Sequence, residues 1–305
     1  MGNRLLVIGE ALVDVVTDSD GSSTEHIGGS PANVAVGLAR LDHTVDFATW
    51  LGDDDRGRRI ARHLERHGVR VLPEGLRAER TSVAIATLDQ SGAASYDFDL
   101  HWELPEVTLA PSTTHVHTGS IATVLQPGAQ SVTTALRAVR EVGTVSYDPN
   151  IRPSIMGDLG AVRERVEELV GLSDVVKASE DDLELLYPGE SAEQVMARWV
   201  TLGAGLTLVT LGADGVVYRV ASDEQTLSEP ARAERVVDTV GAGDSFMAGL
   251  VSGLLVAGLL GDPGARERLR GATLEDVRPA VDRGLATSGV TVGKAGAYAP
   301  SLDEL

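Results

Sequence analysis

The chain has 305 residues, no cysteine, 26 lysines and arginines, and 45 aspartates and glutamates, so its formal net charge is −19. The lack of cysteine excludes a disulfide framework, thiolate metal ligands and a cysteine nucleophile. A nucleic-acid partner is not expected, because a duplex binder needs a basic face to neutralise phosphates. The hydrophobic fraction of 43% is ordinary for a folded protein.

The first apolar run, residues 5–16, is interrupted by Glu10 and Asp14. It is too short and too charged for a membrane span or a secretory signal. We therefore expect a cytoplasmic protein with no membrane partner.

Short apolar runs alternate with amphipathic helical stretches along most of the chain. Ser30 is expected to cap the first helix, with Pro31 at the first helical position. This alternation is typical of βαβ units, so we predict an α/β fold whose mainly parallel sheet is covered on both faces. Strands are predicted at 5–8, 45–51, 116–121, 145–148, 175–178 and 206–211, and helices at 31–41, 56–67, 130–141, 161–170, 192–202 and 246–260.

Two stretches, residues 11–27 and 80–104, alternate in polarity without an intervening helix. In the second, 81–88 and 94–98 read as a hairpin with a turn at Ser91 and Gly92. Two arrangements fit these segments, a small β lid beside the main body or an ordinary edge hairpin. No linker divides the sequence, so a single domain spanning 1–305 is predicted.

The strongest motif is DTVGAGDSFMAG at 238–249. The small residues Gly241, Ala242 and Gly243 permit a tight turn that brings backbone N–H groups close to a ligand. An apolar helical run follows, and a helix N-terminus binds phosphate. Asp244 lies in the same turn, where it could accept a proton during phosphoryl transfer to a hydroxyl. The alternative is a glycine-rich helix start capped by Asp244.

A second motif, GGSPAN at 28–33, places two glycines before a helix. Gly28 and Gly29 permit close approach of a small polar ligand, and Asn33 offers both a donor and an acceptor. This chemistry suits sugar hydroxyls. The alternative is a capped helix with Asn33 in solvent.

Residues 28–41 resemble the N-terminal signature of the ribokinase-like (PfkB) carbohydrate kinases, and residues 238–249 resemble their C-terminal signature. The two motifs lie in the expected order, and the resemblance extends over nearly the whole chain. It implies a three-layer α/β/α fold with a small β-sheet lid, and ATP-dependent phosphorylation of a terminal sugar hydroxyl.

The resemblance also implies roles for individual residues. Asp244 matches the catalytic base, and residues 241–243 match the anion hole that holds the transferring phosphoryl group. Sugar contacts are implied for Asp14, Gly28, Gly29, Asn33 and, at the mouth of the site, Arg152. Nucleotide contacts are implied for Thr210, Gly212 and Gly215.

The implied cofactors are ATP and Mg²⁺. Many relatives carry an Asn-x-x-Glu motif that organises magnesium, whereas this chain has Ser179 and Asp182 at those places. The shorter Asp182 would reach the ion through water, with Glu180 as a second candidate. The alternative is a solvated helix start. Some relatives also use K⁺ near the C-terminal signature, and Asp238 is the candidate here.

The starts GEALVD at 9–14 and GGSPAN most resemble fructokinases, so fructose is the predicted substrate. Kinases of 2-keto-3-deoxygluconate, ribose or nucleosides remain alternatives. A non-catalytic sugar- or nucleotide-binding regulator is the alternative of another class, although the intact base and anion-hole residues favour an enzyme. Relatives often pair through their lids, which suggests a homodimer, and the alternative is a lid edge blunted by charge.

Two further patterns are given no function. Residues 289–295 imitate a Walker A loop, but only three residues separate the glycines and alanine replaces the magnesium-binding hydroxyl. His115 and His117 alternate on a predicted strand without an apparent third ligand, so we expect packed side chains rather than a zinc site.

Overall fold

The computed structural model describes residues 4–17, 21–88 and 94–305, so the turn predicted at Ser91 and Gly92 lies outside the described residues. The main sheet contains β1 (Arg4–Ile8), β4 (Thr44–Ala48), β5 (Val69–Val71), β8 (Thr113–Gly119), β9 (Thr144–Asp148), β10 (Val175–Ser179), β11 (Leu206–Thr210), β12 (Val216–Val220) and β13 (Leu227–Glu229). Their order is β13-β12-β11-β10-β9-β8-β1-β4-β5. The strands from β11 to β5 run parallel, and β12 and β13 are antiparallel to their neighbours.

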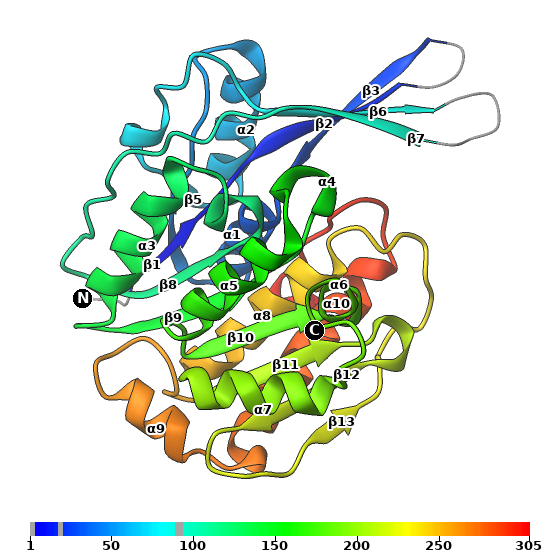
Figure 1. Cartoon of the computed structure of the whole chain (residues 1–305). Coiled ribbons are helices and arrows are strands. Elements are labelled where there is room, and N and C mark those ends of the chain that lie inside the picture. The colour runs from blue at the N-terminus through cyan, green and yellow to red at the C-terminus, as the bar shows by residue number, and fades with distance from the viewer. Residues whose placement is uncertain (1–3, 18–20, 89–93) are drawn as a thin grey trace.

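Helices cover both faces of this sheet (Figure 1). One face carries α1 (Ser30–Arg40), α2 (Asp55–Arg66), α8 (Ala242–Val256) and α10 (Leu274–Val292). The other carries α3 (Gly128–Val139), α5 (Leu159–Val170) and α7 (Ala192–Leu202). The shorter elements are α4 (Pro153–Met156), α6 (Glu180–Leu186), α9 (Ala265–Gly271) and the 3₁₀ turns η1 (Pro73–Gly75), η2 (Ser120–Thr123), η3 (Gly212–Asp214) and η4 (Leu302–Glu304).

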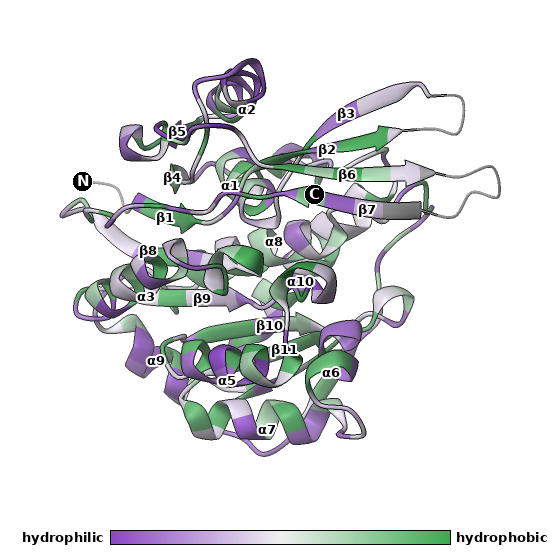
Figure 2. Cartoon of the chain, turned by 45° about the horizontal axis from the view of Figure 1, so that its top comes forward, coloured by the Kyte–Doolittle hydropathy of each residue, from purple (hydrophilic) through white to green (hydrophobic). Residues whose placement is uncertain are grey.

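The alternation of side chains along the central strand β1 explains why both faces are covered. Leu5 and Val7 are buried in the core that includes α1 and α8, whereas Leu6 and Ile8 are buried against α3 and α5. Successive strand residues point to opposite faces, so a strand that is apolar throughout must be covered on both. Figure 2 shows the same pattern, with apolar strands inside and polar residues on the outer surfaces of the helices. The predicted three-layer α/β fold is confirmed.

A second, smaller sheet projects from the main body (Figure 1). It contains β2 (Leu12–Thr17), β3 (Ser23–Gly28), β6 (Val83–Leu88) and β7 (Ala94–Asp99), in the order β3-β2-β6-β7. The outer pairs are antiparallel and the central pair β2–β6 is parallel. These strands form a sheet of their own, which confirms the lid and removes the edge-hairpin alternative. That the chain is one domain stays a prediction.

The local predictions fail where a boundary depends on tertiary contacts. The N-cap of α1 is Gly29, at φ 110°, and no side chain caps the helix, so the prediction that Ser30 is the cap is wrong. Helix α8 begins at Ala242, four residues before the predicted start, because Gly241 adopts a left-handed conformation. The long helix α10, which contains Pro279, was not predicted, since an internal proline normally ends a helical pattern.

The Walker-like stretch at 289–295 lies at the end of α10 and in the turn that follows. A helix C-terminus presents carbonyl oxygens rather than N–H groups, so this stretch is not a phosphate loop. Within the described ranges, none of the helices is both long enough and apolar enough to cross a membrane.

Helix α8 approaches α10 closely at Gly249. A Cβ atom placed there would lie 2.8 Å from the carbonyl oxygen of Arg283 and 2.9 Å from the Cα of Gly284. A side chain at position 249 would therefore push the two helices apart. This contact fixes the position of α8, whose N-terminus forms part of the site described below.

We expect Gly249→Ala to destabilise the fold by about 1–3 kcal/mol, because the methyl group overpacks the α8–α10 contact. Gly271→Ala is the matched control, since a Cβ at Gly271 in α9 meets no atom within 4 Å. Chemical denaturation of both variants tests this. Helix propensity favours alanine inside α8 at least as much as at the end of α9, so equal stabilities of the two variants would contradict the packing argument.

Candidate active site

A large cleft of about 1910 Å³ lies where the lid meets the main body. Its walls come from the lid, from the first turns of α1 and α8, and from the carboxyl ends of β10 and β11. Ligands bind at this edge of open parallel sheets, because the loops that follow the strands diverge there. The predicted site residues that line the cleft are Asp14, Gly28, Gly29, Asn33, Arg152, Glu180, Asp182, Thr210, Gly212, Gly241, Ala242, Gly243 and Asp244.

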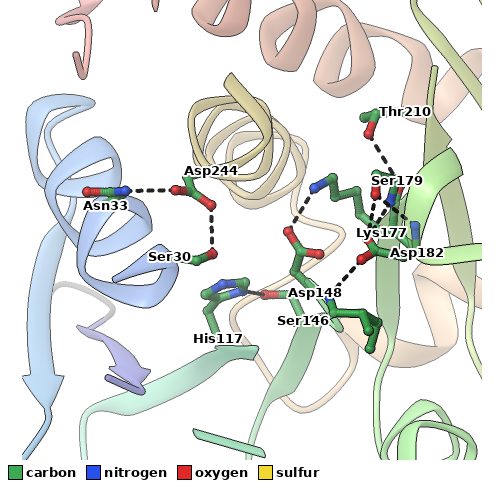
Figure 3. A network of polar contacts seen from close by, with 12 residues as sticks. Ser30, Asn33, His117, Ser146, Asp148, Lys177, Ser179, Asp182, Thr210 and Asp244 are labelled. Atoms are coloured by element: carbon green, nitrogen blue, oxygen red, sulfur yellow. Dashed lines mark hydrogen bonds and ion pairs between the residues drawn. The ribbon is translucent and has the colours of Figure 1, made fainter. Parts of the chain in front are cut away.

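Asp244 lies in the first turn of α8 and joins the two sequence signatures (Figure 3). The Ser30 hydroxyl donates a hydrogen bond to Oδ1 at 2.6 Å, and the Asn33 side-chain amide donates to Oδ2 at 2.8 Å. A carboxylate has about four acceptor positions. Two therefore remain for a ligand in the cleft, and the carboxylate is held in one orientation.

The turn before Asp244 requires glycine. Gly241 has φ 76° and ψ 3°, and a Cβ there would lie 2.6 Å from the Cβ of Ala297. No side chain caps this helix end. The positive end of the α8 dipole therefore faces the cleft, and this geometry stabilises a bound anion.

On the lid side, Asp14 projects from β2 opposite His26 of β3. Burial raises the pKa of the Asp14 carboxyl, while His26 and Arg152 oppose the shift. A Cβ on Gly28 would overlap Asp14 Oδ2, so the glycine leaves room for this carboxylate. The structure thus brings the lid carboxylate to the same cleft as Asp244.

Glu10 is a cleft residue that the sequence analysis did not select. It lies two residues after the end of β1, and its Oε2 accepts a hydrogen bond from the Ala122 N–H in η2 at 3.2 Å. Burial raises its pKa to about 7, although bonds from Ser120 and Ala122 favour the charged form. Its place at the carboxyl end of a buried strand was the signal that could have identified it.

Lys177 and Asp148 form a buried ion pair beside the cleft (Figure 3). The Lys177 ammonium lies 2.8 Å from Asp148 Oδ2. Burial raises the pKa of Asp148 to about 6, and the attraction of Lys177 opposes that shift. The sequence analysis gave neither residue a role, because both read as strand residues.

Asp182 serves the local structure of α6. Its Oδ2 accepts from the Ser179 backbone N–H at 2.8 Å and the Ser179 hydroxyl at 2.7 Å, and Oδ1 accepts from the Ile151 N–H at 2.6 Å. Glu180 and Asp181 are exposed and line the cleft. Among the described residues no three His, Cys, Asp or Glu side chains are grouped for a metal. Magnesium needs only one or two carboxylates when phosphates complete its shell, so this acidic edge fits it.

Of the remaining predicted residues, Thr210 and Gly212 line the cleft, whereas Gly215 is not among its lining residues. Thr210 ends β11 and its hydroxyl donates to the Ala178 carbonyl at 3.3 Å. Gly215 shapes the turn behind Gly212, because a Cβ there would overlap the Glu229 carbonyl oxygen.

Asp238 accepts hydrogen bonds from the N–H groups of Val240 and Gly296, which lower the pKa of its carboxyl. It therefore ties the loop before α8 to the C-terminal segment.

His115 and His117 are packed side chains, as predicted. Burial lowers the pKa of both to about 3, so both rings are neutral at physiological pH. Thr144 and Ser146 on the neighbouring strand β9 hydrogen-bond to these rings at 2.9–3.0 Å.

A covered parallel sheet with a β lid, and a carboxylate at a helix N-terminus, define the ribokinase-like class of phosphotransferases. The model of the pfkB family of carbohydrate kinases matches residues 3–304, so the chain belongs to this family.

Named relatives of this family are similar to the chain over most of its length. A fructokinase from Klebsiella pneumoniae is 34% identical over 268 residues, which are 85% of this chain and 87% of that protein. A crystal structure of a Vibrio cholerae fructokinase double mutant with fructose, ADP and potassium ion has a TM-score of 0.82 at 29% identity, covering 99% of this chain and 96% of that one. A Xylella fastidiosa fructokinase with bound ATP has a TM-score of 0.85 at 25% identity, with coverages of 99% and 96%.

The raised pKa of Glu10 makes the stability of the fold depend on pH. Between the ordinary value of 4.5 and about 7, the folded chain keeps a proton that the unfolded chain has released. Its stability contribution is therefore complete below pH 4.5 and is lost as the pH rises through 7. The free energy of unfolding of wild type should fall between pH 5 and pH 8, whereas Glu10→Gln lacks this titration. The stability of Glu10→Gln relative to wild type should therefore be higher at pH 8 than at pH 5, by an amount on the order of 2–3 kcal/mol.

Thermal melts of wild type and Glu10→Gln at both pH values test this expectation. The exposed Glu103→Gln is the control, and its difference from wild type should not change with pH. A constant difference for Glu10→Gln as well would show that Glu10 has no raised pKa.

Proposed function

We propose that this chain is an ATP-dependent fructokinase that transfers the γ-phosphoryl group of ATP to a terminal hydroxyl of fructose. The observation that carries the proposal is the position of Asp244. Its carboxylate lies at the N-terminus of α8 and is held by Ser30 and Asn33 of the sugar signature. The names of the fructokinase relatives support fructose as the sugar.

In the proposed mechanism, Asp14 and Asn33 orient the sugar and the lid excludes water from the cleft. Asp244 accepts the proton of the attacking hydroxyl, because two of its acceptor positions remain open. The helix N-terminus at residues 241–243 stabilises the negative charge that develops on the phosphoryl oxygens. Thr210 and Gly212 line the part of the cleft that holds the nucleotide, and Arg152 faces the sugar.

Mg²⁺ bound to the nucleotide would neutralise phosphate charge during transfer. Glu180 and Asp181 are the exposed carboxylates that would hold its water shell, since both oxygens of Asp182 already accept hydrogen bonds. A K⁺ ion near Asp238 is a second proposed cofactor, supported by the potassium in the Vibrio cholerae structure.

One observation favours a second candidate, a nucleoside kinase of the same family. Tyr96 and Phe98 on the lid strand β7 both line the cleft, with ring planes 5° apart and centroids 6.2 Å apart. Such rings can stack on a base as well as pack against a sugar.

Cytoplasmic location and pairing of two copies through their lids stay predictions. The lid sheet has β3 and β7 as its outer strands. Unpaired strand edges can join a second sheet, which supports pairing as a proposal.

We expect Asp244→Asn to lower kcat about 100- to 10,000-fold, because the amide cannot accept the proton. ATP and fructose should still bind, and the melting temperature should stay close to wild type. The exposed surface variant Asp55→Asn is the control and should keep wild-type rates. A wild-type kcat in Asp244→Asn would remove the base from the mechanism.

A substrate panel decides between the candidates. Rates with fructose, ribose, 2-keto-3-deoxygluconate and adenosine are measured at equal ATP and Mg²⁺. We expect fructose to give the highest kcat/KM by at least tenfold. A higher value for adenosine would favour the nucleoside kinase, and no phosphorylation of any of them would favour the non-catalytic regulator.

A further inference from the structure

The Lys177–Asp148 pair is an unusual feature for the inside of a protein. Lys177 is only 4% exposed and Asp148 only 1%, yet the lysine reaches the wall of the cleft. Burying two charges costs several kcal/mol per ion, and the attraction between them often does no more than offset that cost. An apolar pair would fold at least as well, so stability alone does not account for this pair.

The ammonium of Lys177 lies beside the turn that precedes Asp244. A Cβ placed on Gly243 would come within 3.0 Å of Lys177 Nζ. Gly243 is the second residue of α8, so the positive charge lies next to the positive end of the helix dipole. The ammonium charge and the partial positive charge of the helix N-terminus thus lie together at one part of the cleft, and this arrangement stabilises a bound anion.

Lys177 is surrounded by more than one negative charge. Burial works against its charge, but Asp148, Asp182 and Asp244 outweigh burial and raise the pKa of the ammonium. Lys177 therefore stays protonated throughout the physiological range. An ammonium has three donors, and Asp148 accepts one of them.

Asp148 holds the Lys177 side chain in place but accepts only one of its three possible hydrogen bonds. Its Oδ2 accepts the ammonium bond, whereas its buried Oδ1 has no hydrogen-bond partner among the described residues. Asp182 already accepts three hydrogen bonds, two from Ser179 and one from Ile151. One hydrogen bond to Asp148 therefore fixes the Lys177 ammonium, and its other two donors remain for a ligand in the cleft near Gly243.

We propose that Lys177 is a catalytic residue that donates to the phosphoryl group while that group passes from the nucleotide to the sugar, an inference that rests on the proposed function. The new bond joins the sugar oxygen to the γ-phosphorus, and the bond that breaks joins this phosphorus to the β,γ-bridging oxygen. The hydroxyl proton goes to Asp244, and ADP leaves with the bonding electron pair. Lys177 keeps its proton and stabilises the equatorial oxygens, while Asp148 positions it.

The test separates catalysis from packing with three variants, Lys177→Met, Asp148→Asn and the double variant. The double variant removes both buried charges, so its melting temperature should return close to wild type. Its kcat should nevertheless stay about 100- to 1,000-fold below wild type, as when one donor to a transition-state oxyanion is lost. Recovery of kcat to within threefold of wild type would overturn the proposal and leave Lys177 a structural role.

Nucleotide binding supplies a readout that does not depend on the sugar. By calorimetry, the double variant should bind ATP at least tenfold more weakly than wild type and ADP within twofold, because only ATP carries the γ-phosphate. Equal weakening of both nucleotides would contradict a contact with that phosphate. If wild type phosphorylates no sugar, the proposed function fails, but the ATP–ADP comparison still decides the role of Lys177.

A second pair of variants keeps the test decisive if the double variant does not fold. Lys177→Gln and Lys177→Arg both keep a donor for Asp148, but only arginine keeps the charge. We expect at least a tenfold higher kcat for the arginine variant. Equal rates would overturn the proposal.

Discussion

The hydrogen bonds from Ser30 and Asn33 to Asp244 are the contacts on which the site depends. They join residues that are 214 and 211 positions apart in the sequence. They can form only because α1 and α8 pack on the same face of the sheet, with their N-termini at the same edge. Asp244, which we propose as the proton acceptor, is therefore oriented by the helix that begins in the GGSPAN motif.

In the proposed function an acidic protein binds a highly charged nucleotide, so the local charge of the cleft matters more than the net charge of the chain. The chain carries a net charge of −19, and Glu10, Asp14 and Asp244 all line the cleft. A helix N-terminus supplies only about half a positive charge. The full charge of Lys177, placed beside that terminus, adds a stronger attraction at the same corner. Burial meanwhile raises the pKa of Glu10 to about 7, so near neutral pH this carboxyl is charged only part of the time and repels an anion less.

Sequence reasoning was reliable where a pattern has a local physical cause. Alternating apolar runs gave the covered parallel sheet, and the glycine turn at 241–243 gave the helix N-terminus beside Asp244. It was wrong at Ser30, because a serine before a proline is a typical cap, whereas its hydroxyl here turns to a residue on another helix. It missed Lys177 and Glu10, because a charged residue inside or just after a strand does not reveal which way it points.

The sequence by itself determined the kind of fold, the family and the position of the acid in its turn, since each follows from periodicity or from a short motif whose backbone geometry only small residues allow. Only the tertiary structure decided that Asp182, besides completing the capping box of α6, holds Ile151, that the lid is a separate sheet, and that a buried lysine lies beside Gly243. These facts depend on contacts between segments far apart in the chain. The energy of such contacts depends on the distance between the groups and on their burial, and neither can be read from the order of the residues.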